Sequence, residues 1–463
     1  MDPAPVGAKT IRKVIVASSL GTLFEWYDFY LYGSLAVFFG GLFFPPGNET
    51  AALLASLATF GAGFGVRPIG ALVFGHIGDR VGRKYTFLIT MATMGISTAL
   101  IGVLPTYEQV GMGSTIALVA LRLLQGLALG GEYGGAATYV AEHVPDARRG
   151  YFTSYIQTTA TLGFFLSMGV IGTTRIALGE ADFYAYGWRL PFLLSFALVA
   201  ASIYIRIRMQ ESPMFTALKA RGETVKNPLK ESFTNPVNLR YVLLALFGAT
   251  AGQGVVWYTG QFYALTFLQS TLKIDWQTSY VMMSIALVLT TPLFVAMGAL
   301  SDRIGRKRII LTGCALAALT YVPIYMAMKH FGNPDGLAAA DPAQINHVAI
   351  VLLLTLQMVY VCMVYGPIAA FLVELFPTRI RYTSMSLPYH LGNGWFGGFL
   401  PLIATAVTTS AAVKGWLGGD AIYAGLAYPI AICLLTLVVG GLYIRETKDH
   451  RLDGAAITPP SPR

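Results

Sequence analysis

Charged residues are scarce in this chain. Asp, Glu, Lys and Arg make up 12% of its 463 residues, whereas the AVILMFWYC set makes up 55% and the mean hydropathy is +0.60. A soluble protein of average composition carries roughly 25% charge. With half that proportion, the chain cannot cover a globule of this size with charged side chains, which excludes disorder, a coiled coil and an ordinary soluble fold. What remains is a protein that crosses a membrane several times.

Cysteines and catalytic motifs are also rare or absent. The three cysteines, Cys314, Cys362 and Cys433, lie in apolar stretches and lack metal-ligand spacing, so we predict no metal site and no cofactor. No Gly-Lys dipeptide occurs, which excludes a P-loop and makes direct use of ATP unexpected. Neither H-E-x-x-H nor G-x-S-x-G is present. A membrane enzyme is therefore a remote alternative, and a channel is made equally remote by the duplicated loops described below.

Apolar runs recur along the whole chain, and each is long enough to cross a bilayer, which takes about 20 residues. They fall near residues 14–38, 52–75, 85–104, 115–141, 151–174, 187–207, 241–268, 278–300, 309–328, 347–373, 383–408 and 421–444. The sequence thus predicts an all-α polytopic membrane protein with twelve transmembrane helices.

The positive charges are distributed unevenly between the two sets of connecting segments. With the N-terminus placed inside, the inner segments hold 25 of the 32 Lys and Arg residues and the outer segments hold 5. This bias predicts that both termini lie in the cytoplasm. It also accounts for the net charge of +9 without nucleic acid, because the basic residues form no single stripe. We expect a bacterial inner-membrane protein with the lipid bilayer as its surroundings, and a monomer.

Two loop patterns occur twice. The pattern G-x3-D-R-x-G-R-K appears at residues 75–84 and 298–307, and E-x2-P-x3-R appears at residues 142–149 and 374–381. Each copy follows the equivalent span of a six-span unit, so the repeats predict two similar six-helix bundles in parallel orientation. We assign residues 1–207 and 241–446 to the bundles, 208–240 to a cytoplasmic linker and 447–463 to a cytoplasmic tail. A solute site is then expected near the middle of the membrane, between the bundles.

These loops, together with three further stretches, resemble the major facilitator superfamily and its metabolite:proton symporters. The stretches are Glu25-Trp26-Tyr27-Asp28-Phe29, Arg67-Pro68-Ile69-Gly70, and Arg122 to Gly126 continuing to Gly135. The resemblance implies the major facilitator fold of two pseudo-symmetric six-helix bundles, alternating access and no enzymatic activity. The stretch from Trp257 to Ala264 looks most like the haloacid and short-monocarboxylate branch.

The first loop pattern is the candidate gate. Its aspartates lie at the inner ends of helices among Arg and Lys, where a charge latch can form between helices. The resemblance implies that it controls alternating access without touching the solute; the competing interpretation is ordinary inner-loop charge. The candidate gating residues are Asp79, Arg80, Arg83, Asp302, Arg303 and Arg306.

Five charged residues lie well inside predicted spans, away from their ends: Glu25, Asp28, Arg67, Arg122 and Glu132. Each costs roughly 2.5–3.5 kcal/mol to insert at the centre of a membrane helix, so these residues must be paired or line a wet cavity. Glu25 and Asp28 share one helix face, where two carboxylates repel and one is expected to hold a proton. We predict that Asp28 and Arg122 form a pair that opens on protonation, as the resemblance to sugar:proton symporters also implies, and that Glu25 is a second proton carrier. The alternative is that the charges only hold helices together, which we favour for Arg67 and Glu132.

Polar and aromatic residues occur at helical spacing in several spans. Such groups can orient a small polar solute, although hydrogen bonds between helices or an interfacial aromatic belt would also explain them. Together with Arg122 and Arg67, the candidate solute-binding residues are Gln157, Gln253, Trp257, Tyr258, Gln261, Tyr365 and Asn393.

Arginines in a wet cavity suit a carboxylate, because the guanidinium fork matches it. We therefore predict a proton symporter that imports a small organic acid, favouring a short monocarboxylate or haloacid. A zwitterionic osmolyte such as proline or betaine is the first alternative, because it would use both an acid and an arginine. A dicarboxylate or a shikimate-type acid is the other.

Overall fold

The computed structural model describes residues 8–81, 83–131, 133–207, 228–377, 380–450 and 452. All regular secondary structure in these ranges is helical. Mostly apolar segments adopt helices in a membrane because a helix satisfies every internal backbone hydrogen bond within the segment.

The first half contains six spans, several of them broken into shorter helices. Its elements are α1 (Ala8–Ser34), α2 (Ala36–Phe43), α3 (Glu49–Gly65), α4 (Arg67–Val81), α5 (Arg83–Ile101), α6 (Tyr107–Val110), α7 (Met112–Gly130), α8 (Tyr133–Ala141), η1 (Asp146–Arg148), α9 (Arg149–Leu178), α10 (Glu180–Asp182), η2 (Phe183–Gly187), α11 (Arg189–Leu193) and α12 (Ser195–Ile207).

The second half repeats this plan. Its elements are α14 (Pro228–Thr234), α15 (Pro236–Ala245), η3 (Leu246–Thr250), α16 (Ala251–Tyr258), η4 (Thr259–Tyr263), α17 (Ala264–Thr266), η5 (Phe267–Thr271), α18 (Trp276–Ile304), α19 (Arg306–Gly332), α20 (His347–Tyr365), α21 (Ile368–Leu375), α22 (Arg381–His390), η6 (Leu391–Gly398), α23 (Leu400–Thr409), α24 (Ala411–Leu417), η7 (Gly418–Leu426) and α25 (Ala427–Tyr443).

The twelve-helix architecture is confirmed. Eight helical segments are long and apolar enough to cross a membrane, and the bent pair 180–187 with 189–204 makes a ninth. The helix α1, the helix α5 and the broken segment α22–α23 complete the predicted set. The seventh span begins at Pro236, where Asn235 caps the helix by accepting a hydrogen bond from the Val237 amide, rather than at residue 241. Residues 208–227 of the predicted linker lie outside the described residues.

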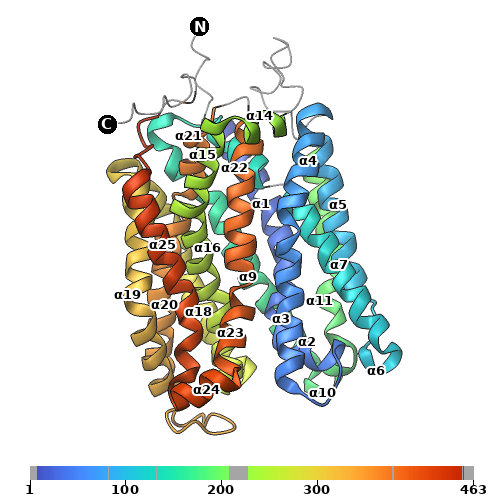
Figure 1. The fold of residues 1–463 in the computed structure, drawn as a ribbon. Helices are drawn as coiled ribbons and strands as arrows, with labels where there is room; N and C mark the ends of the chain where they lie inside the picture. The colour runs from blue at the N-terminus through green and yellow to red at the C-terminus, as the bar shows by residue number, and fades with distance from the viewer. Residues whose placement is uncertain are drawn as a thin grey trace.

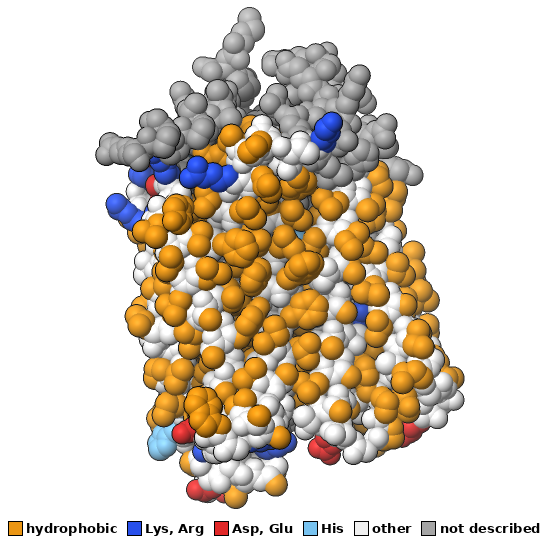
Figure 2. Space-filling model, viewed as in Figure 1, with side chains coloured by type: hydrophobic (Ala, Val, Ile, Leu, Met, Phe, Trp, Pro, Cys, Tyr) orange, Lys and Arg blue, Asp and Glu red, His pale blue; other side chains and the backbone are white. Residues whose placement is uncertain are grey.

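The two halves lie side by side in Figure 1, with α4 and α14 at one end and α6, α10 and α24 at the other. We call these the α14 end and the α24 end. Helix α9 of the first half packs along α1 of its own half and along α18 of the other, and α3 packs against η6. The pairs α9–α18 and α3–η6 therefore bring the halves together. Hydrophobic side chains cover the middle of the face in Figure 2 and charged ones gather at its two ends, as a lipid-facing surface requires.

Candidate solute site and gate

Two glycines let the second and fourth spans touch through their backbones. A Cβ on Gly126 of α7 would collide with the carbonyl of Gly63, and one on Gly70 of α4 would collide with the carbonyl of Leu127. Only glycine permits such close packing. The contact fixes α4 against α7 and thereby places Arg67 and Arg122 in the interior, where both side chains are fully buried.

Within the described part of the chain, Arg67 has no hydrogen-bond partner at any of its three guanidinium nitrogens. Its Cζ atom instead lies 3.9 Å from the centre of the Phe64 ring, 4.4 Å from that of Phe29 and 5.1 Å from that of Trp26. Aromatic faces attract a cation, but they do not use its N–H donors. Arg67 is thus a buried cation with its full donor set available to an anion.

Arg122 donates some of its hydrogen bonds to residues of its own half. Its Nη1 donates to Gln125 Oε1 at 2.7 Å and to the Phe29 carbonyl at 3.2 Å, and Gln125 Nε2 donates to Thr98 Oγ1 at 2.7 Å. Its Nε and Nη2 have no hydrogen-bond partner in the ranges that the structure describes. The Phe29 ring centre lies 4.2 Å from Arg122 Cζ, so this one ring contacts both arginines.

Asp28 faces away from the arginines. Ser195 Oγ, at the start of α12, donates to Asp28 Oδ1 at 2.6 Å, and no ion pair joins Asp28 to Arg122 in the part of the chain that the structure describes. The predicted pair is therefore not formed in this structure. Successive residues are about 100° apart around a helix, so Phe29 meets Arg122 while Asp28 turns to the sixth span. Glu25 is buried one turn earlier on α1, and Glu132 lies outside the described residues.

Stacked aromatic rings from both halves continue from Arg67. The Trp26 and Tyr30 rings stack at 5.0 Å, and Tyr30 stacks on Trp257 of α16 at 5.3 Å. Tyr258 lies edge-on to Phe64 at 5.0 Å, and Phe262 lies 5.0 Å from Tyr30. The sequence predicted Trp257 and Tyr258 as lining residues, but it did not single out Trp26, Phe29 and Tyr30 of α1. Their signal was the run of aromatics that flanks Asp28.

The predicted polar stripe of the seventh span divides between two neighbouring helices. Gln253 exchanges two hydrogen bonds with Asn393, at 3.0 and 2.8 Å, whereas Gln261 Nε2 reaches Thr161 on α9 at 3.4 Å. Gln253 lies in α16, whereas Gln261 lies inside the π-helical turn η4, which shifts the helix register. Gln253 and Asn393 thus satisfy each other, while Gln261 Oε1 has no hydrogen-bond partner among the described residues.

Two tyrosines from different halves stack face to face. The ring centres of Tyr133 and Tyr389 lie 3.4 Å apart with an angle of 2° between the planes. Gln157 Nε2 donates to the Tyr133 hydroxyl at 2.6 Å, and the hydroxyls of Tyr365 and Tyr389 are 2.8 Å apart. The predicted residues Gln157 and Tyr365 therefore belong to one polar chain that crosses the interface between the halves.

Several buried polar atoms around these rings have no hydrogen-bond partner among the residues that the structure describes. Besides the Arg67 nitrogens they include Trp257 Nε1, Gln157 Oε1 and Gln261 Oε1. Buried polar groups are normally hydrogen-bonded, because leaving one unsatisfied costs free energy. These unpartnered atoms come from spans of both halves. A small polar solute bound between the halves could form hydrogen bonds with them. The described residues hold no group of three or more His, Cys, Asp and Glu side chains placed to bind a metal.

Ion pairs between the halves close the α14 end. Glu374 of α21 is fully buried and accepts from Arg149 Nη1 at 2.8 Å and from Arg306 Nη2 at 3.1 Å. Arg381 of the second half lies 3.5 Å from Glu142 of the first. The second repeated pattern therefore pairs across the halves, Glu of one copy with Arg of the other, in both directions.

Asp302 of the first pattern also contacts the opposite half. Its carboxylate oxygens accept from the Gly150 and Tyr151 amides at the start of α9, both at 2.8 Å, and one lies 2.7 Å from Arg306 Nη1. A carboxylate is favoured at a helix N-terminus. The Arg303 side chain is exposed. Asp79 and Arg80 lie in α4 and Arg83 begins α5, but their side chains lie outside the described part of the structure.

The halves also touch on the way to the α24 end. The Tyr280 hydroxyl of α18 donates to the Ser34 carbonyl at the end of α1, at 2.5 Å, and Trp395 Nε1 donates to the Gly65 carbonyl at 3.0 Å. Contacts between the halves therefore lie on both sides of Arg67 along the spans.

A twelve-span bundle of two repeated halves, with an unpaired cation between them, defines a membrane transport protein. The model for the Major Facilitator Superfamily matches residues 19–389, and the chain belongs to this family. It is therefore a multi-pass membrane transporter and not an enzyme.

Named relatives cover most of the chain. The inner membrane metabolite transport protein YhjE of Escherichia coli K12 is 35% identical over 408 residues, covering 86% of this chain and 88% of its own. The proline/betaine transporter of the same strain is 32% identical, with 96% and 85% covered. Its shikimate transporter is 32% identical, with 88% and 90% covered.

Among solved structures, the proton:xylose symporter XylE has a TM-score of 0.72 at 18% identity, covering 95% of this chain and 97% of its own. This likeness concerns the fold. None of these relatives is named for a haloacid or a short monocarboxylate, so they give no support to the branch that the sequence suggested.

Proposed function

We propose that the protein is a proton-coupled symporter for a small zwitterionic solute of the proline or betaine kind. The observation that carries this proposal is Arg67, a buried guanidinium with three unpartnered nitrogens inside a cluster of aromatic rings. The solute carboxylate binds Arg67, because a guanidinium pairs with a carboxylate through two parallel hydrogen bonds.

The aromatic rings supply the other half of the recognition. Tyr30, Trp26 and Trp257 form a continuous stack next to Arg67, and ring faces attract ammonium groups. A solute with a carboxylate at one end and a cationic nitrogen at the other fits this arrangement. The 32% identity with a proline/betaine transporter over 96% of the chain supports the same class.

A shikimate-type monoanion is the second candidate. It would use Arg67 for its carboxylate, with the partnerless amide oxygens of Gln157 and Gln261 for its hydroxyl groups, and the 32% identical shikimate transporter supports it. The short monocarboxylate predicted from the sequence would leave these amides unused, so it is the weakest of the three.

Asp28, with Glu25 beside it on α1, carries the coupling proton in this proposal. Asp28 is buried in a membrane span, and it accepts a hydrogen bond from the Ser195 hydroxyl. A carboxylate in such surroundings is costly to ionise without a cation, so it can load and release a proton as the site opens to either side.

The gate is the second part of the proposed mechanism. Asp302, Arg306 and Glu374 hold the α14 end closed during part of the cycle, together with the candidates Arg303, Asp79, Arg80 and Arg83. The α14 end faces the cytoplasm, as the excess of inner Lys and Arg favours, and the membrane is the bacterial inner membrane.

A matched pair of solutes separates the candidates. Betaine and 3,3-dimethylbutanoate have the same shape and the same carboxylate, but only betaine carries a positive charge. The purified protein in proteoliposomes is expected to exchange betaine in counterflow and to accept 3,3-dimethylbutanoate at least tenfold less well. Shikimate is the third substrate in the assay.

Arg67→Lys is the variant that tests the carboxylate contact, and the exposed Arg308→Lys is its control. Loss of betaine counterflow only in the first variant supports the proposal. Equal exchange of the two isosteres would exclude the cation contact, and exchange of shikimate alone would favour the second candidate.

A further inference from the structure

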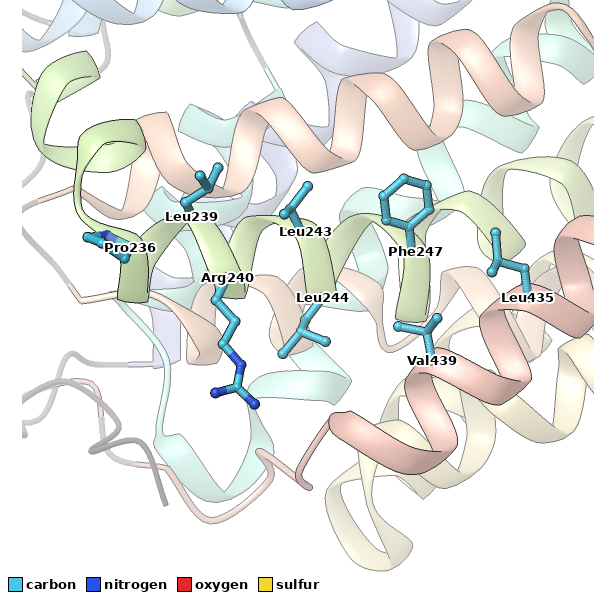
Figure 3. A pocket seen from close by; sticks show the side chains of 8 residues that line it. All are labelled: Pro236, Leu239, Arg240, Leu243, Leu244, Phe247, Leu435 and Val439. Carbon is cyan, nitrogen blue, oxygen red and sulfur yellow. The ribbon is translucent and has the colours of Figure 1, made fainter. Parts of the chain in front are cut away.

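A lipid-facing groove runs between the seventh and twelfth spans. It has a volume of about 520 Å³, and its walls are Leu239, Leu243, Leu244 and Phe247 on one side and Leu435 and Val439 of α25 on the other. Figure 3 shows Arg240 and Leu244 projecting from α15 on the side where α25 carries Val439. The groove is apolar along its length and has one cation, Arg240, at its end nearest α14.

A second hollow continues from that end. It has a volume of about 480 Å³ and shares Pro236, Arg240 and Leu244 with the groove. Its remaining walls include Tyr241, Tyr443, Arg445 and His450. An apolar channel that opens, at the end of two spans, into a pocket with charged side chains in its walls matches the two parts of a phospholipid. We call the second hollow the headgroup pocket.

The charges of the headgroup pocket favour an anion. Arg240 and Arg445 are exposed, and the structure gives neither side chain a hydrogen bond or an ion pair among the described residues. The pocket also contains two acids, but both are engaged elsewhere. Glu446 accepts from the Arg306 amide at 2.7 Å and from the Lys307 amide at 3.1 Å, and Asp449 lies 3.8 Å from Lys448 Nζ. Two arginines are therefore left for a phosphate, which guanidinium groups bind in bidentate fashion.

We infer that the groove and the headgroup pocket together bind one anionic phospholipid of the bilayer. Its phosphate lies between Arg240 and Arg445, and an acyl chain lies between α15 and α25. Tyr241 and Tyr443 flank the phosphate, as interfacial tyrosines do at headgroup level. This inference rests on the chain being embedded in a membrane, and it is independent of which solute is carried.

The site also adjoins the gate. Glu446, a wall of the headgroup pocket, caps the start of α19, and the next residue, Thr447, donates to Glu374 Oε2 at 2.7 Å. A bound lipid would therefore hold the segment after α25 against the ion pairs that close the α14 end.

Lipid retention by the full chain in detergent tests the inference. Native mass spectrometry would compare dioleoyl phosphatidylglycerol with dioleoyl phosphatidylcholine. The wild type is expected to bind one phosphatidylglycerol at least tenfold more tightly than phosphatidylcholine. The double variant Arg240→Gln/Arg445→Gln should lose this preference, Arg240→Lys/Arg445→Lys should keep most of it, and Arg308→Gln, an exposed arginine outside the pocket, should leave it unchanged.

A groove-filling variant separates a lipid from a soluble phosphate. Val439→Trp leaves both arginines in place but occupies the acyl channel, so it should weaken phosphatidylglycerol at least fivefold. Equal binding of the two lipids by the wild type, an unchanged preference in the double glutamine variant, or full retention in Val439→Trp would each overturn the inference. Should the double variant fail to fold, the single variants Arg240→Gln and Arg445→Gln give the same readings.

Discussion

Arg149 Nη1 lies 2.8 Å from Glu374 Oε1, and both side chains are fully buried. The arginine comes from the first copy of the E-x2-P-x3-R pattern and the glutamate from the second. The contact therefore joins the two halves at the α14 end, where Glu374 also accepts hydrogen bonds from Arg306 and Thr447. One carboxylate thus holds three groups from three separate segments.

Glu374→Gln is expected to destabilise the protein strongly. It leaves two buried arginines without their shared countercharge, and breaking a buried ion pair on one side costs about 3–5 kcal/mol. Thermal unfolding of the purified protein checks this, with Glu49→Gln, an exposed acid at the start of α3, as the control. Equal melting temperatures for the two variants would show that the pairs contribute nothing.

Gly126→Ala should abolish transport while Gly113→Ala should not. Both glycines lie on α7, but a methyl group at 126 collides with the Gly63 carbonyl, whereas at 113 it meets no atom within 4 Å. Forcing α3 and α7 apart costs about 1–3 kcal/mol and displaces Arg122 and Arg67. Solute counterflow in proteoliposomes distinguishes the two variants, and a fully active Gly126→Ala would contradict the argument.

Asp28→Asn is expected to uncouple transport. An amide keeps the hydrogen bond with Ser195 but carries no titratable proton, so uphill uptake driven by a pH gradient is lost and counterflow exchange remains. Ser195→Ala is the companion variant, because it removes the hydroxyl and leaves the carboxyl group. Undiminished uphill uptake by Asp28→Asn would exclude the coupling role of Asp28.

Membrane potential should drive uptake if the solute is a zwitterion. One proton with one zwitterion carries one positive charge inward, and 100 mV is worth about 2.3 kcal/mol per charge, or about 50-fold in accumulation. Co-transport of one proton with a monoanion moves no net charge. A potassium–valinomycin potential across proteoliposomes at equal pH measures the difference, and indifference to that potential would point to the monoanion.

Acid pH should loosen the segment after α25. Burial lowers the pKa of His450 below its ordinary value of 6.5; Glu374 opposes the shift, and Arg149 and Arg381 add to it. The packed segment thus favours neutral His450. The stability that neutral His450 gives to the packed segment is fully present above pH 6.5. It falls as the pH drops below that value, because the segment binds more protons when it is released from the protein than when it is packed. Hydrogen exchange of residues 444–450 at pH 7.5 and 5.5, corrected for intrinsic rates, should show faster exchange at pH 5.5, and His450→Gln should remove the difference.

The sequence predicted the features of the fold that follow from repeated loop patterns and from hydropathy. The twelve spans follow from apolar length, and the duplicated loop patterns drew attention to Asp302 and Arg306, which contact the other half and Glu374 in the structure. Arg67 and Arg122 stood out because a charge within a span is costly. Apolar length, a repeated pattern and a charge within a span can all be recognised without knowing how the helices pack.

Partner choice could not be predicted in the same way. Asp28 and Arg122 do not pair in this structure, because the rotation of α1 about its axis directs Phe29, not Asp28, to the arginines. Gln253 and Gln261 separate because of a π-helical turn that spacing alone does not reveal. Thr447 reaches Glu374 across 73 residues, and no local pattern indicates such a contact.

The place of Phe29 has a consequence for coupling. Its ring touches both buried arginines and its carbonyl accepts from Arg122, while the residue before it binds the sixth span through Ser195. A change in protonation at that residue has to cross a single peptide bond to disturb the surroundings of both guanidinium groups. In the proposed mechanism, the coupling proton and the solute are therefore bound at neighbouring positions of the chain, and no relay through the bundle is needed.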